Sequence, residues 1–304
     1  MEDKNNYGDL LRLVIKSVLL ALCGVFFPFI YIFLPAMYIA ESIKRGILEI
    51  IGVFLGLCLV IGLIFSPING VVIFTIFGPL ILVFHYMIVS KKSAEMTLIA
   101  GAVSFFTSVI ILLISFGVNA EVLNSKDTIS GLINLYTDMG REVGMSESEI
   151  FMISSKISEM YKMFLQMAPS YLIISSLVFS YIIYISVTRT MYTRGKIIIG
   201  PPSLELLRIP RDLIFLGIIT IVVFKIFNIS KDYEIISKNL LYITLFLLFV
   251  EGLAIVKFFM TSMKVNRFLQ TIIIIIGLTF SYVQLLLIFL GFVDLIVNFR
   301  KLVV

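Results

Sequence analysis

The sequence has few charged residues, two cysteines and a single histidine among its 304 residues. Charged residues make up 14% of the chain and hydrophobic residues 60%, and the mean hydropathy is +1.10. This composition excludes an ordinary soluble protein, because no stretch is polar enough to build a separate soluble core. Repeated uncharged runs are long enough to cross a bilayer whose hydrocarbon layer is about 30 Å thick. We therefore expect an all-α, polytopic transmembrane helix bundle that forms one domain over residues 1–304.

Residues that carry common catalytic chemistry are also scarce. Cys23 and Cys58 lie inside apolar runs, so neither a disulfide framework nor a zinc site is indicated. His85 is the single histidine, which argues against a metal centre or a catalytic triad. The sequence contains no nucleotide-binding P-loop, HExxH or GxSxG motif. We expect a protein that is not an enzyme and that holds no metal or cofactor.

The basic residues lie mainly in short loops between the apolar runs, and the formal net charge is +5. This arrangement is typical of the orientation signal of membrane proteins rather than of nucleic-acid binding. The first apolar run is too long for a cleavable signal peptide and lacks a small-residue cleavage site, so we expect the first span to be retained. The prediction is a multi-pass protein of the cell membrane, embedded in the lipid bilayer, with a cytoplasmic N-terminus.

The uncharged residues 17–40 allow two interpretations, a single span or a hairpin of two helices at about 10–27 and 29–43 that meet at Pro28. We choose the hairpin, because it places more of the loop Lys and Arg residues on the cytoplasmic face. With the remaining spans, the chain would have about eight or nine membrane helices. Those spans are expected at about 47–65, 71–90, 95–118, 168–188, 212–229 and 240–262, and from 268 onward.

Residues 119–165 form a long polar segment. Apolar residues at helical spacing predict an amphipathic helix that ends at Gly144. A second amphipathic helix is expected to begin at Ser146, with Glu149 as its capping-box partner. Pro169 would then open the next span. In this topology the loop is external, and its helices either cover a cavity as a lid or lie at the level of the lipid headgroups.

The segment from Phe268 to Val304 is almost entirely apolar, yet polar or small residues recur along one face of the helix that it predicts. That stripe must face a protein interior or a wet cavity, because an unpaired polar group in lipid costs several kcal/mol. The stripe consists of Ser281, Gln284, Gly291, Asp294 and Asn298.

The sequence allows two different positions for Asp294. A straight helix from Phe268 would carry Asp294 to the outer interface, where it would be solvated. A break near Gly277–Thr279 would instead turn Asp294 and Asn298 into the bundle, where Arg300 is an available partner. These three polar residues form a candidate terminal cluster.

Glu251 and Lys225 lie at a similar depth near the bilayer midplane, in consecutive spans of opposite direction. An acid and a base at matching depth suggest a pair or a shared substrate-binding site, to which Ser281 and Gln284 would contribute. Two structural alternatives stay open. Lys225 can extend its ammonium group to the interface, and Glu251 can be a protonated, hydrogen-bonded carboxyl that serves packing.

Small residues spaced four apart occur in two of the expected helices, as Ser17 with Ala21 and as Gly52 with Gly56. Such steps let helix backbones approach closely in lipid. They can serve packing within this bundle or helix docking onto another membrane subunit. The basic loop 189–211 can likewise contact anionic lipid or a cytoplasmic partner protein.

Four short pieces of the chain carry a resemblance to a known family. They are Ala168-Pro169-Ser170, the loop from Pro201-Pro202 to Leu207-Arg208-Ile209-Pro210, Glu251-Gly252-Leu253-Ala254, and the ending Leu290-Gly291-Phe292-Val293-Asp294 to Asn298-Phe299-Arg300-Lys301. Over most of its length the chain resembles the YybS-like family of uncharacterised bacterial multispan membrane proteins. That family is similar at a distance to the S-components of energy-coupling-factor transporters, whose first helix docks a shared coupling subunit through an AxxxA step. The resemblance implies a membrane coupling subunit with ATPases as a partner, with Ser17-xxx-Ala21 in place of that step.

The polar stripe, Glu251 and this resemblance together lead us to expect a substrate-binding or transport subunit for a small molecule of unidentified chemistry. The alternative is a noncatalytic membrane scaffold or assembly partner, which the Gly52–Gly56 step and the basic loop favour.

Overall fold

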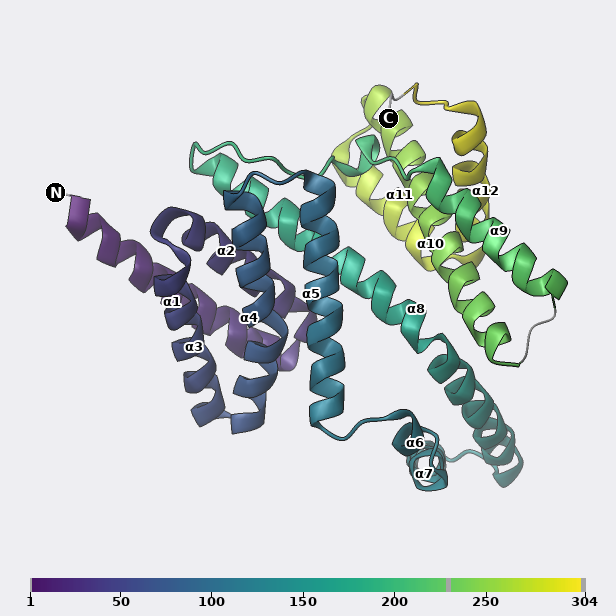
Figure 1. Cartoon of the computed structure of the whole chain (residues 1–304). Helices are drawn as coiled ribbons and strands as arrows, with labels where there is room; N and C mark the ends of the chain where they lie inside the picture. The colour runs from purple at the N-terminus through teal and green to yellow at the C-terminus, as the bar shows by residue number, and fades with distance from the viewer. Residues whose placement is uncertain (1, 228–230, 302–304) are drawn as a thin grey trace. The chain divides into compact units, whose positions relative to one another are not determined.

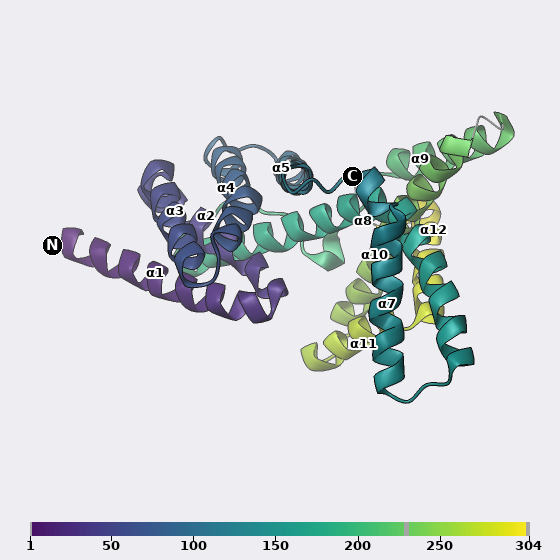
Figure 2. The same cartoon turned by 90° about the horizontal axis from the view of Figure 1, so that it is seen from below.

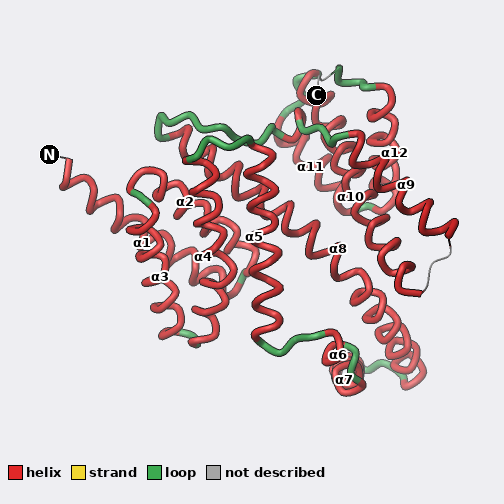
Figure 3. Tube along the Cα trace, in the orientation of Figure 1, coloured by secondary structure: helices red, strands yellow, loops and turns green. Residues whose placement is uncertain are grey.

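The computed structural model describes residues 2–227 and 231–301. In these residues the chain forms helices joined by loops, without a strand, which confirms the all-α class (Figure 3). The structure divides into two compact units, each described separately below. Unit 1 comprises Met1–Ser154 and Ser175–Pro201, and unit 2 comprises Ser155–Ile174 and Pro202–Val304.

Unit 1 contains the first seven α-helices and contributions from both ends of the long helix α8, Glu147–Thr193 (Figure 1). The predicted break at Pro28 is confirmed. Because Pro28 has no backbone N–H and a fixed φ, it begins the short 3₁₀ helix η1 instead of continuing α1. The elements are α1 Glu2–Phe26, η1 Pro28–Ile32, α2 Phe33–Arg45, α3 Ile47–Ile64, α4 Pro67–Val89, α5 Ala94–Ser115, α6 Ala120–Leu123 and α7 Lys126–Glu142.

Aromatic side chains lie at the centre of the core of unit 1. Tyr38, Phe54, Phe84 and Tyr184 are all fully buried. The rings of Tyr38 and Phe54 meet edge to face, with centroids 4.9 Å apart. The hydroxyl of Tyr184 donates to the carbonyl oxygen of Ile199 at 2.6 Å. This bond fastens the basic segment that follows α8 to the helix itself.

Helix α8 begins where the sequence predicts. The Ser146 hydroxyl accepts a hydrogen bond from the Glu149 N–H, and the Glu149 carboxylate accepts one from the Ser146 N–H at 2.9 Å. This capping box satisfies two backbone donors at the start of the helix. Figure 2 shows the short turn between α7 and α8, in which Gly144 has a φ of +79°. Residues 119–165 therefore contain the short α6, the helix α7 and the first part of α8.

Pro169 does not open a new helix, and the predicted boundary there is wrong. Helix α8 is continuous over 47 residues, with Pro169 inside it. The side chain of Asn239, from α10, repairs the backbone next to the proline. Its Oδ1 accepts from the Ser170 N–H at 2.9 Å, and its Nδ2 donates to the Gln166 carbonyl at 2.7 Å. The amide thus takes the place of the bond that Ser170 would make to Gln166 in a regular helix.

Unit 2 is built around α10 and α12, which pack closely side by side (Figure 1). Glycines on both helices make the close approach possible. A Cβ at Gly252 would lie 2.0 Å from the carbonyl oxygen of Leu287, and a Cβ at Gly291 would lie 2.0 Å from that of Leu248. The elements of unit 2 besides its part of α8 are η2 Leu204–Leu206, α9 Arg211–Phe227, α10 Lys231–Ser262, α11 Arg267–Thr279 and α12 Ser281–Val297.

The last apolar segment is broken between α11 and α12, whose axes differ by 101°. Phe280 takes an extended conformation at the break, with φ −95° and ψ 116°. The Gln284 side chain donates to the carbonyl oxygen of Leu278 at 2.7 Å, which satisfies one of the groups left open at the end of α11. The segment therefore adopts the bent alternative rather than the straight helix.

Five helices in the described part of the chain are long and apolar enough to cross a membrane, namely α3, α4, α5, α8 and α10. The bent pair α11 and α12 is either a broken sixth span or a re-entrant loop. The expected number of about eight or nine spans is not confirmed. Helix α2 has only 13 residues, and the apolar stretch of α1 is interrupted by Arg12 and Lys16. The predicted span at 212–229 corresponds to α9, and residues 228–229 lie outside the described part.

Candidate functional site

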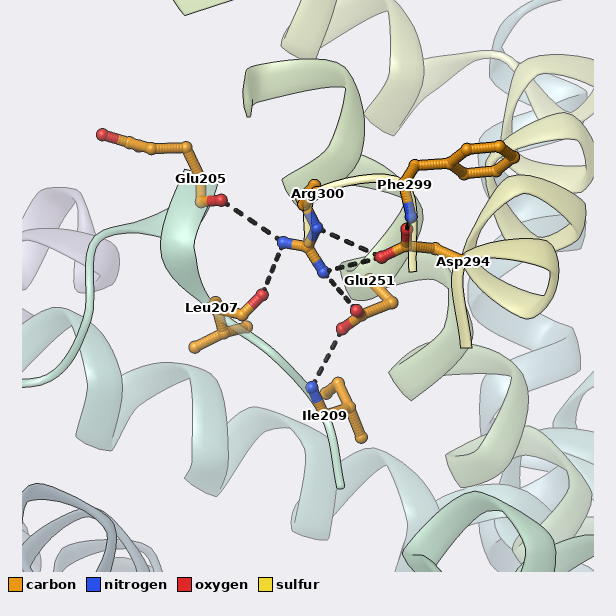
Figure 4. A network of polar contacts seen from close by, with 7 residues as sticks. All are labelled: Glu205, Leu207, Ile209, Glu251, Asp294, Phe299 and Arg300. Atoms are coloured by element: carbon orange, nitrogen blue, oxygen red, sulfur yellow. Dashed lines mark hydrogen bonds and ion pairs between the residues drawn. The ribbon is translucent and has the colours of Figure 1, made fainter. Parts of the chain in front are cut away.

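Three charged side chains of unit 2 are buried together in what we call the charge cluster (Figure 4). Glu251 is 1% exposed, Asp294 is 2% exposed and Arg300 is 5% exposed. Charges removed from water to this degree are costly unless they are paired and hydrogen-bonded. The charge cluster is therefore a candidate functional site.

The end of α12 brings Arg300 to the cluster. Asn298 terminates the helix in the left-handed conformation, with φ 55° and ψ 58°. The Phe299 N–H then donates to Oδ1 of Asp294 at 2.6 Å. This reversal of the chain directs the Arg300 side chain back towards Glu251 in the middle of α10 (Figure 4).

The guanidinium of Arg300 has a partner within the chain for each of its N–H groups. Nη2 contacts Oε1 of Glu251 and lies 3.1 Å from Oδ2 of Asp294. Nε lies 3.2 Å from the same Asp294 oxygen. Nη1 donates to the carbonyl oxygens of Glu205 at 3.3 Å and Leu207 at 2.7 Å. No donor of Arg300 is left over for a ligand.

The second oxygen of Glu251 is engaged as well, because Oε2 accepts a hydrogen bond from the Ile209 N–H at 2.9 Å. The two carboxylates are thus stabilised by one guanidinium and by backbone N–H groups of Ile209 and Phe299. These bonds tie the loop 205–209 and the residues after α12 to α10. The charge cluster therefore has the properties of a structural ion-pair network that holds these segments together.

The structure does not assemble the predicted substrate site around Glu251. The predicted pair with Lys225 is not formed: Lys225 is exposed near the end of α9, while Arg300 and Ile209 are the partners of Glu251. Ser281 is exposed at the start of α12, and Gln284 is used at the break between α11 and α12. The bend at Phe280 is the physical reason, because it turns Asp294 and the residues after it towards α10. Of the terminal cluster, Asp294 and Arg300 meet, and Asn298 supplies the turn.

The two small-residue steps have different surroundings. Ser17 and Ala21 are fully buried within unit 1. The hydroxyl of Tyr38 donates to Oγ of Ser17 at 2.9 Å, and that of Tyr31 donates to the carbonyl oxygen of Ala21 at 3.1 Å. This step is therefore covered by the chain itself rather than open to a second subunit.

Gly52 and Gly56 on α3 are open. A Cβ added at either glycine would meet no atom within 4 Å outside its own helix backbone and chain neighbours. Packing within unit 1 does not use these two glycines, so a face of α3 without side chains is available to a partner helix or to lipid.

A second candidate site, missed by sequence reasoning, is a cavity of about 580 Å³ in unit 1. We call it the basic cavity. Apolar parts of its wall come from Leu13, Met37 and Met191. Its charged lining consists of the cations Arg12, Lys16, Lys44, Arg194 and Lys196 and the carboxylate of Glu41.

The basic cavity lies where α1, the end of α2 and the end of α8 meet. Arg12 and Lys16 are four residues apart and share a face of α1. Lys44 is in the last turn of α2, and Arg194 and Lys196 follow α8. The sequence contains these bases, and their position beside apolar runs predicts orientation in the membrane, but their convergence depends on segments more than a hundred residues apart.

Glu41 is held at the edge of this cavity by two arginines. It is 4% exposed, and its Oε1 lies 2.7 Å from Nη2 of Arg194. Its Oε2 accepts a bond from Nε of Arg45 at 3.4 Å. The side chain of Arg45 is 4% exposed and that of Arg194 is 41% exposed. One partner of Glu41 is thus buried, and the other is accessible from solvent.

No group of three or more His, Cys, Asp or Glu side chains within residues 2–227 and 231–301 could hold a metal ion. No curated protein and no solved structure matches the chain. One family model does match, over residues 14–295, and it describes a predicted membrane protein, DUF2232. The match includes Glu251, Asp294 and Glu41, whereas Arg12 and Arg300 lie just outside it. With its several apolar helices, the chain is an integral membrane protein, and it belongs to the DUF2232 family of predicted membrane proteins.

Proposed function

We propose that this protein is a noncatalytic membrane subunit that binds a small molecule in the basic cavity, of the transport type to which S-components belong. The observation that carries the proposal is the cavity itself. Its volume of about 580 Å³ lies within the range of about 300–1,000 Å³ that is usual for small-molecule sites. With six charged side chains and three apolar ones in its lining, the cavity is more polar than most such sites, which favours a charged ligand.

We place the binding site at the basic cavity rather than at Glu251. A ligand at the charge cluster would have to displace Arg300 from two buried carboxylates and two carbonyl oxygens, at a cost of several kcal/mol. The barrier at the basic cavity is lower, because Arg12, Lys16 and Lys196 are exposed at its wall. Displacing Arg194 from Glu41 would still leave Glu41 its bond to Arg45. The YybS-like resemblance, with its distant similarity to S-components, adds a coupling subunit with ATPases as the expected partner.

A thermal-stability screen tests the proposal. The purified full chain in phosphatidylcholine nanodiscs would be heated in the presence of metabolites grouped by charge. A ligand that binds only the folded state stabilises by RT ln(1 + [L]/Kd), which is about 2.7 kcal/mol at one hundred times Kd. We expect at least one anionic metabolite to raise the unfolding temperature.

The same screen on a Lys16→Gln, Arg194→Gln double variant is the control, because it removes two cations from the cavity wall. The rise in unfolding temperature should disappear in this variant. A broad panel that shifts neither protein, or shifts both equally, contradicts binding in the basic cavity.

A membrane scaffold is the second candidate function, and the open Gly52–Gly56 face of α3 favours it. Crosslinking in native membranes separates the two functions. A coupling subunit with ATPases among the partners supports transport, whereas one stable partner of another kind supports a scaffold.

Gly56→Leu should abolish crosslinks that depend on this face, since its side chain would keep a second helix backbone at a distance. Gly131→Leu on α7 is a matched control, because Gly131 also has no atom near its missing Cβ. Equal crosslinking in both variants would exclude docking at Gly52–Gly56.

A further inference from the structure

We infer that the ligand of the basic cavity carries a phosphate group, and that Arg194 exchanges its bond to Glu41 for a bond to that phosphate. The inference rests on the proposed function, in that both assign a ligand to this cavity. It goes further by naming the ligand's chemical class and the side chain that responds to it.

The lining of the basic cavity is predominantly cationic. Its lining has five cationic side chains and one carboxylate, Glu41. Glu41 has a second arginine partner, Arg45, which is not part of the cavity lining. The cavity therefore presents a strongly positive surface even after Glu41 is taken into account. Such a surface attracts an anionic ligand and repels a cationic one.

The number and origin of the cations point to phosphate rather than to a simple carboxylate. A phosphate monoester carries a charge of about −1.5 to −2 at neutral pH and has three strong acceptor oxygens. It can accept charge-assisted hydrogen bonds from several Lys and Arg side chains at once. The cations come from three separate parts of unit 1, namely α1, α2 and the segment after α8, so they can surround such a group from different sides.

The apolar part of the wall adds a requirement on the rest of the ligand. Leu13 and Met191 are almost fully buried and line the cavity together with Met37. A phosphate attached to an organic group would use both the cationic and the apolar walls. Such a group is supplied either by a soluble phosphate monoester or by the monoester headgroup of phosphatidic acid, and the two share the same phosphate chemistry.

Arg194 is the cation most able to respond to the ligand. Its side chain is 41% exposed and its Nη2 lies 2.7 Å from Oε1 of Glu41. If Arg194 turns to a phosphate, the Glu41 carboxylate keeps the buried Arg45, so no buried charge is left alone. Glu41 thus competes with an anionic ligand for Arg194, and its ion pair keeps Arg194 beside the cavity.

Binding measurements on the full chain in nanodiscs test the inference. Glycerol 3-phosphate, inorganic phosphate and succinate would be titrated into protein in phosphatidylcholine nanodiscs, with isothermal calorimetry as the readout. Lipid binding would be measured by native mass spectrometry after reconstitution with and without phosphatidic acid. We expect a phosphate-bearing probe to bind more tightly than succinate.

Single substitutions in the cavity are expected to weaken or strengthen phosphate binding according to the charge that they remove. Arg194→Gln and Lys16→Gln should each weaken phosphate binding about tenfold or more, since each removes a charge-assisted hydrogen bond. Glu41→Gln should tighten it, because it releases Arg194 and removes the negative charge at the cavity; Arg45 retains Glu49 at 3.7 Å in that variant. Arg267→Gln changes an exposed cation of unit 2 and should have no effect.

Each outcome decides between the two claims. Tight binding of glycerol 3-phosphate that depends on Arg194 supports both. Binding of phosphatidic acid alone, again dependent on Arg194, supports the phosphate chemistry and overturns the small-molecule function. Succinate binding as tight as glycerol 3-phosphate overturns the phosphate inference and leaves the proposed function standing. Absence of binding by every probe and lipid overturns the inference, and weaker or unchanged binding in Glu41→Gln overturns the exchange of Arg194.

Discussion

Replacing Arg300 with methionine is expected to destabilise unit 2 by about 3–5 kcal/mol. The change leaves Glu251 and Asp294 buried without a cation. It also removes the bonds that hold the carbonyl oxygens of Glu205 and Leu207. Hydrogen exchange of the backbone amides in α10 and α12, measured on the purified protein in detergent, should therefore accelerate, and the unfolding temperature should fall.

Two comparisons isolate the cause of this loss. Arg267→Met removes an exposed arginine from the start of α11, and its effect should stay within about 0.5 kcal/mol. A triple variant, Glu251→Gln with Asp294→Asn and Arg300→Met, removes every charge of the cluster. It should be more stable than Arg300→Met alone, because the largest cost arises from the uncompensated buried carboxylates. A wild-type exchange pattern in Arg300→Met would contradict the structural role of the cluster.

Replacing Gly291 with alanine is expected to separate α10 from α12. The new Cβ would lie 2.0 Å from the carbonyl oxygen of Leu248 and 3.0 Å from the backbone nitrogen of Gly252. The obstacle is backbone on a neighbouring helix, so no side-chain rotation can relieve the clash. Overpacking of this kind costs about 1–3 kcal/mol, and the backbone contact places Gly291→Ala at the upper end of that range. Gly252→Ala should behave similarly, because its Cβ would lie 2.0 Å from the carbonyl oxygen of Leu287.

The same substitution at Gly52 is the matched control, and it is not expected to destabilise the protein. Gly52 is on a helix and has open space around its missing Cβ. Alanine is favoured over glycine in a helix by up to about 1 kcal/mol, so Gly52→Ala should leave the unfolding temperature unchanged or raise it. Hydrogen exchange localises the effect of Gly291→Ala to α10 and α12. Equal unfolding temperatures for Gly291→Ala and Gly52→Ala would show that the two helices do not pack through their glycines.

Several features of this protein follow from the sequence alone, because they depend on residues near one another in the chain. The uncharged runs predict membrane-spanning helices, because they are long enough for a helix to cross the bilayer and a helix satisfies its own backbone hydrogen bonds in lipid. Pro28 ends α1 through its missing N–H. Ser146 and Glu149 start α8 through bonds across a single turn. The requirement that Glu251 find polar partners also follows from the sequence, because a lone charge in hydrocarbon is costly.

Tertiary structure alone determines which partners those residues have. Glu251 pairs with Arg300, 49 residues away, rather than with Lys225, because the break at Phe280 redirects α12. Pro169 fails to end a helix because a side chain 69 residues away replaces the missing backbone bond.

The basic cavity arises in the same way, from cations that range from Arg12 to Lys196 along the chain. Considered with only its neighbours in the sequence, each of these basic residues indicates the orientation of the chain in the membrane. Periodicity and capping describe single helices, whereas pairing of charges, repair of a proline and convergence of cations depend on how helices pack. The sequence therefore determines the helices and the need for buried polar partners, and the packing determines where the candidate site lies.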